Sequence, residues 1–208
     1  MQVSRRFFNG RVIFAERSAF AVALVFGCFL IGVCSGNLIA NKIPMNESSE
    51  LYSYFSTFLI LMENEELTPS SVCYTVFTYL KYPCLALCLG MIGAGVFFVA
   101  LLSIYQGFTL AFSVVTFLAV TGESGILPAI VLFGFRCAIV LPCYFYIAEH
   151  SVSASISRMV GKRAFGLRKT YAFRILFCIL ILICGALLEH FAAEDFLYLI
   201  LQYRRGDF

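Results

Sequence analysis

Long apolar runs alternate with short polar segments along this chain, and the runs define the predicted elements. Five runs are interpreted as membrane-spanning helices, at residues 19–40, 82–102, 107–121, 126–147 and 171–188. An α-helix rises about 1.5 Å per residue, so about 20 apolar residues cross the hydrocarbon core of a bilayer. The third run is short, and we expect it to cross as a tilted helix packed against the fourth.

The polar segment at residues 41–81 contains a different pattern. Its apolar residues recur at helical spacing, while polar residues occupy the other sides of the same helix; the apolar set is Leu51, Tyr54, Phe55, Phe58, Leu59 and Met62, and the polar set is Glu50, Ser53 and Thr57. This predicts an amphipathic helix over residues 50–62, outside the membrane. The helix either docks a partner, with Glu50, Tyr54 and Phe58 as contact candidates, or lies in the bilayer interface.

Composition supports a membrane class and excludes a water-soluble globule. Hydrophobic residues make up 61% of the chain and charged residues 13%, whereas soluble domains have about 45–50% and about 25%. We therefore predict one all-α, polytopic membrane domain over residues 1–208. Eight of the nine cysteines fall in apolar runs and none forms a Cys-x-x-Cys pair, so we expect free thiols. No basic cluster is interleaved with aromatic residues, so nucleic acid is not an expected partner.

Positive charge is distributed unevenly between the flanks of the spans. Lys and Arg number four in residues 1–18 and five in 150–170, against one in 41–74 and none in 189–195. Five crossings place the two basic flanks on the same side, which predicts a cytoplasmic N-terminus and an extracytoplasmic C-terminal tail. If residues 107–121 did not cross, the segment with five cations would face outward, and this is why we predict a crossing there.

Arg136, inside the fourth span, is the most specific candidate for a site. A cation near the centre of a span costs about 2.5–3.5 kcal/mol on insertion scales, so its side chain should face protein or water. Glu123 and Glu149 are each 13 residues away, about 20 Å along a helix, and no acid is expected at its depth. The open interpretations are a substrate or ion site, a guanidinium capped by backbone carbonyls, and pairing with a partner subunit.

Glycines give two of the predicted spans a small face. The first span contains Gly32-x-x-x-Gly36, and the second contains Gly90, Gly93 and Gly95. Small faces let two helices approach closely. The pattern leaves open whether the neighbouring helix belongs to this chain or to a partner.

Candidate catalytic groups are few. Gly122-Glu123-Ser124-Gly125 matches the short signature of rhomboid-type intramembrane proteases, in which a histidine from another span activates the serine. The two histidines, His150 and His190, fall in predicted flanks, and a turn explains the same four residues. No metal-ligand spacing or phosphate-binding loop occurs, so we expect no cofactor, no metal and no enzymatic activity.

Several stretches, in order along the chain, resemble the stage II sporulation protein M family. They are the first span ending in Gly32-x-x-x-Gly36, the segment Glu50 to Phe55, the block Tyr105 to Val114, the serine-rich Ser151 to Ser155, and the ending Leu188 to Phe191. The chain differs from the family at Gln106, where the family has lysine. It also differs at residues 133–137, where the family has Leu-Pro-Gln-Asn.

The resemblance implies a membrane component of the engulfment machinery of endospore-forming bacteria. In that role the chain is a non-enzymatic scaffold in the bacterial cell membrane that recruits two peptidoglycan-degrading partners, the sporulation proteins D and P. The alternative left open by the residues themselves is a small transporter or channel subunit organised around Arg136.

Overall fold

The computed structural model describes residues 2–43, 53, 57, 72–122, 126–159 and 169–205. Within these residues the regular structure is helical, and five helices are long and apolar enough to cross a membrane. They are α1 (Gln2–Ala40), α3 (Val72–Gly90), α4 (Gly95–Thr121), α6 (Phe135–Met159) and α7 (Lys169–Arg205). The predicted all-α polytopic class is confirmed.

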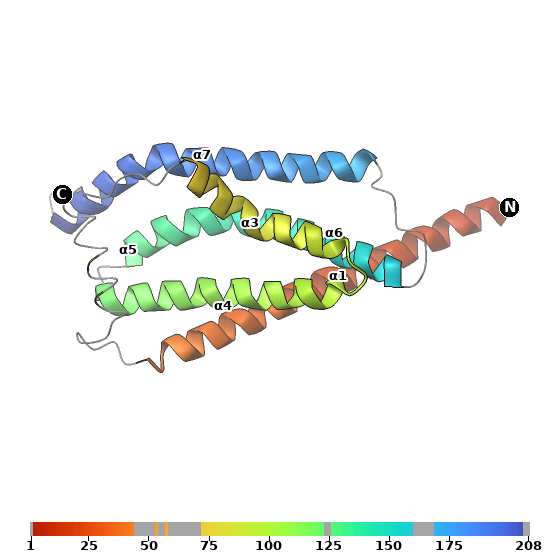
Figure 1. Ribbon diagram of the computed structural model, residues 1–208, viewed down its shortest axis with the longest axis horizontal. Helices are drawn as coiled ribbons and strands as arrows, with labels where there is room; N and C mark the ends of the chain where they lie inside the picture. The colour runs from red at the N-terminus through yellow and green to blue at the C-terminus, as the bar shows by residue number, and fades with distance from the viewer. Residues whose placement is uncertain are drawn as a thin grey trace.

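The five helices lie alongside one another with their long axes in a common direction, and the two ends of the chain lie at opposite ends of this bundle (Figure 1). An odd number of crossings requires that placement. The most extensive helix pair is α1 with α4, and α3 packs on α6, α7 and α4. The helix α6 packs on all four of the other crossing helices and therefore occupies the centre of the arrangement.

The interior contains two clusters of buried side chains. One surrounds Tyr144, Ile147 and Val152 of α6 and includes residues of α1, α3 and α4. The other joins α3, α6 and α7 through Tyr79, Val140, Cys143, Leu182 and Ala186. Large apolar side chains also cover the outside of the bundle, as expected where lipid replaces water as the solvent.

The boundaries predicted for the second and third spans are wrong. The prediction placed one span over residues 82–102, but α3 ends at Gly90 and a turn at residues 91–94 leads into α4. Backbone bonds of the turn join Met91 N to Cys88 O at 3.1 Å and Gly95 N to Ile92 O at 3.0 Å. The helix α3 begins at Val72, ten residues before the predicted start of the second span. The short run 107–121 is the second half of α4, which has 27 residues.

The fourth predicted span, 126–147, is also longer than expected. It consists of α5 (Ile126–Ala129), a π-helical segment η2 (Ile130–Gly134) and α6, which continues to Met159. Residues 150–159 of the predicted basic loop 150–170 therefore belong to α6, and residues 169 and 170 belong to α7. The fifth predicted span, 171–188, lies within α7, which extends beyond it in both directions.

Side chains near the end of α6 form hydrogen bonds with the backbone around the α3–α4 turn. The buried Ser155 hydroxyl accepts a hydrogen bond from the Val96 amide at 3.2 Å and lies 2.7 Å from the Gly93 carbonyl oxygen, to which it can donate. Arg158 donates from Nη1 to the Gly90 carbonyl oxygen at 3.1 Å. We call Ser155 and Arg158, together with their partners Gly90, Gly93 and Val96, the turn clamp.

Candidate intramembrane cationic cavity

Arg136 lies in the first turn of α6, directly after the π-helical segment. A π-helical turn inserts an extra residue and changes the direction in which the following side chains project. Arg136 is half-buried, and its guanidinium carbon lies 5.2 Å from the centroid of the Tyr79 ring on α3. Arg136 therefore makes a cation–π contact inside the bundle.

Tyr79 connects Arg136 to an acid that the sequence analysis placed elsewhere. Its side chain is fully buried, and its hydroxyl donates a hydrogen bond to Oε2 of Glu189 on α7. Glu189 lies within the membrane-crossing part of that helix, Ala172–His190. The expectation that no acid lies at the depth of Arg136 is wrong, because Glu189 binds the same tyrosine from a third helix.

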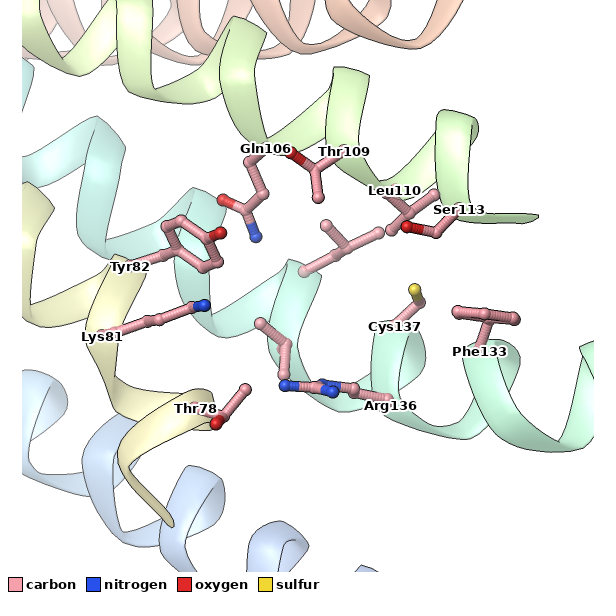
Figure 2. A pocket seen from close by; sticks show the side chains of 12 residues that line it. Thr78, Lys81, Tyr82, Gln106, Thr109, Leu110, Ser113, Phe133, Arg136 and Cys137 are labelled. Carbon is pink, nitrogen blue, oxygen red and sulfur yellow. The ribbon is translucent and has the colours of Figure 1, made fainter. Parts of the chain in front are cut away.

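A cavity of about 230 Å³ lies between α3, α4 and α6 beside this group. Its polar and charged lining comes from Thr78, Lys81 and Tyr82 of α3, Gln106, Thr109 and Ser113 of α4, and Arg136 of α6. Figure 2 shows the side chains of Lys81, Gln106 and Arg136 converging on this space from the three helices. We call this space the cationic cavity, because no Asp or Glu is among the described residues that line it.

Lys81 is the second cation of the cavity, and the sequence analysis missed its position. The prediction placed it just before a span, whereas it lies in the middle of α3, nine residues from either end. That distance corresponds to about 13 Å along the helix. Its Nζ atom lies 4.7 Å from the centroid of the Tyr82 ring. Lys81, in the middle of one crossing segment, and Arg136, at the start of another, therefore border one cavity.

Gln106 contributes a buried polar group without a partner. Its side chain is 7% exposed, and its Oε1 atom makes no hydrogen bond to any residue that the structure describes. A buried polar atom left without a partner destabilises a fold by about 1–3 kcal/mol. The neighbouring hydroxyl of Thr109, by contrast, donates to the Tyr105 carbonyl oxygen of its own helix at 2.9 Å.

The small face of α1 serves a different contact from the cavity. A Cβ atom on Gly32 would overlap the Ile104 carbonyl of α4, and one on Gly36 would lie 3.1 Å from the Phe108 Cα atom. The close approach left open by the sequence is therefore made within this chain, between α1 and α4. It is separate from Arg136.

The other predicted contact residues cannot be placed in the same way. Glu50, Tyr54 and Phe58 lie outside the described residues, as does Ser124 of the protease-like signature. Ser53 and Thr57 of the same amphipathic segment are described, and both are helical. All nine cysteines are free, as predicted.

The helices and the cavity define a polytopic all-α membrane protein. Comparison with protein families then shows which one: the chain belongs to the stage II sporulation protein M family, whose model matches residues 22–194. The matched region begins in α1, ends in α7 and includes Lys81, Arg136 and Glu189. The resemblance found in the sequence is confirmed. No curated protein and no solved structure matches the chain.

Proposed function

We propose that this protein is a non-enzymatic scaffold of the bacterial cell membrane that holds peptidoglycan-degrading partners during engulfment. The observation that supports this proposal is the family match over residues 22–194, which includes residues of all five crossing helices. By the family resemblance, the expected partners are the sporulation proteins D and P.

The proposed orientation places the N-terminus in the cytoplasm. With the helix ends now known, residues 1–18 and 160–171 lie on the same side of the membrane and contain four Lys and Arg each. Residues 41–71, on the other side, contain only Lys42. This asymmetry supports an extracytoplasmic position for residues 41–71 and for the C-terminal tail. The amphipathic segment 50–62 then faces the compartment in which cell-wall enzymes act.

Reconstitution tests the scaffold directly. Purified chain in phospholipid nanodiscs is incubated with membrane-anchored sporulation proteins D and P, and bound protein is quantified after affinity capture. We expect stoichiometric capture of at least one of them. The double variant Tyr54→Ala and Phe58→Ala should reduce capture, whereas the control Thr57→Ala on the same segment should not. Absence of capture by the intact chain would contradict the proposal.

A transporter or channel subunit is the second candidate, and one observation favours it. Lys81 and Arg136 line a common cavity within the bundle, an arrangement typical of ion and substrate pathways. Anion flux into vesicles containing the protein distinguishes the two functions. Flux that Arg136→Leu abolishes, with partner capture unchanged, would favour transport over the scaffold.

A further inference from the structure

We propose that the cationic cavity binds a carboxylate carried by a transmembrane helix of a partner protein, between Lys81 and Arg136. This proposal deepens the scaffold function, because it names the chemistry by which one partner would be held. The charge, the depth and the open side of the cavity support such a ligand.

The charges around the cavity do not balance. Lys81 and Arg136 bring two positive charges, and the lining contains no acid among the described residues. Glu189 is held by the Tyr79 hydroxyl and can offset one of the two charges through that tyrosine. An unpaired cation away from water is costly, and charged residues within membrane helices usually pair with one another. An acidic group in the cavity would complete the pairing.

The depth of Lys81 in the membrane indicates what kind of molecule carries this acid. Lys81 lies about 13 Å from either end of α3, whereas lipid phosphates lie outside the hydrocarbon core. A carboxylate on a neighbouring membrane helix can be presented at this depth with no movement across the bilayer. The cavity is also open on one side, because Lys81 is exposed and Thr78 and Thr109 are only half-buried.

The acid is expected from a different protein rather than from a second copy of this chain. Among the five crossing segments, the acids are Glu149 and Glu189. Glu189 already accepts the hydrogen bond from Tyr79. Glu149 lies 13 residues after Arg136 on α6, about 20 Å farther along the helix. A second copy would therefore present its acids at the wrong depth or lose an internal contact.

The size and remaining polarity of the cavity also suit a carboxylate. A cavity of 150 Å³ holds benzene, so about 230 Å³ accommodates a carboxylate with an associated water. Such a water would donate to Gln106 Oε1, which has no partner in the part of the chain that the structure describes. The same ligand would then satisfy both cations and the buried amide oxygen.

A designed helix provides the test. The full chain, with a fluorescent protein at its C-terminus, is reconstituted in phosphatidylcholine vesicles with a leucine-rich single-span peptide labelled as energy-transfer acceptor. Peptides carry one Glu at successive depths, and the control peptide carries Leu at every such position. We expect about tenfold tighter association for Glu at the depth of Lys81 than for the control. Equal association of all peptides would overturn the proposal.

Variants assign the preference to the cavity. Lys81→Met and Arg136→Met should each remove most of the preference for Glu. Arg174→Met is the control, because Arg174 is a cation of α7 that does not line the cavity, and this variant should retain the preference. A preference that survives both cavity substitutions would overturn the proposal. If the methionine variants fail to elute as folded protein, the depth dependence in the unchanged chain decides. In that case a preference independent of depth would contradict the proposal.

Two further measurements distinguish a partner helix from other ligands of the cavity and separate the cavity proposal from the scaffold proposal. If phosphatidylglycerol in the vesicles, or inorganic phosphate in the buffer, abolishes the preference for Glu, the site binds a lipid or a small anion and the partner-helix proposal is wrong. If proteins D and P are captured but no peptide shows a preference, only the cavity proposal fails. If the Glu peptide binds but neither protein is captured, only the scaffold proposal fails.

Discussion

The turn clamp and the cationic cavity are both polar regions inside an apolar bundle, and they differ in how their polar groups are satisfied. In the turn clamp, Ser155 and Arg158 bond to backbone groups of the α3–α4 turn. In the cavity, Lys81 lies over the face of the Tyr82 ring, and Gln106 Oε1 has no hydrogen-bond partner among the described residues. Polar groups in a membrane need hydrogen-bond or ionic partners. The polar groups of the turn clamp find them within the fold, whereas those of the cavity point to a ligand.

The largest expected effect comes from overpacking the clamp. A Cβ atom on Gly90 would lie 2.6 Å from the Ser151 Cβ atom, whereas one on Gly93 meets nothing within 4 Å. We expect Gly90→Ala to lower the free energy of unfolding by about 3 kcal/mol and Gly93→Ala to leave it nearly unchanged. Thermal unfolding in detergent measures both. Equal midpoints for the two variants would show that α6 does not pack against this turn.

A smaller loss is expected when the clamp loses its hydroxyl. Ser155→Ala leaves the Val96 amide without its side-chain acceptor and should reduce stability by about 1–2 kcal/mol. Ser157→Ala is the matched control, because that hydroxyl donates only to the Ser153 carbonyl of its own helix. A control variant as unstable as Ser155→Ala would remove the distinction between the two serines.

Removing a polar group from the cavity should not lower the stability of the protein, in contrast to the substitutions in the turn clamp. Gln106→Leu replaces a buried amide, whose Oε1 atom has no hydrogen-bond partner among the described residues, by an apolar side chain of similar size, so we expect unchanged stability or a gain of up to about 1 kcal/mol. Ser103→Ala on the same helix is the contrast, since its buried hydroxyl pairs with the Tyr144 hydroxyl at 2.8 Å and its removal should destabilise. A marked loss of stability in Gln106→Leu would place the amide in a structural network.

The fold class and the number of crossings could be predicted from the sequence because both depend on the total length of apolar sequence. The helix ends between residues 82 and 121 could not. The chain reverses at residues 91–94 through apolar residues and glycine, which hydropathy does not distinguish from a continuing span. Ser103 and Gln106 looked like a break between spans, whereas both are buried on α4.

The candidate site was predicted only in part, for a related reason. Arg136 stood out because it lay inside an apolar run. Lys81 and Glu189 border apolar runs, and a charge beside such a run predicts the end of a span. The contact between Tyr79 and Glu189 joins residues 110 positions apart, and no local pattern reports such a contact. The small face at Gly32 and Gly36 was recognised, but only the structure identified α4 as its neighbour.

If the cavity serves binding rather than folding, Lys81→Met should separate the two properties when stability and affinity are measured on the same preparation. We expect an unfolding midpoint equal to or above that of the unchanged chain, together with about a tenfold loss in affinity for the leucine-rich helix that carries Glu at the depth of Lys81. A destabilisation of about 2 kcal/mol or more with affinity unchanged would show the opposite, because Lys81 would then stabilise the fold in the way that Ser155 does.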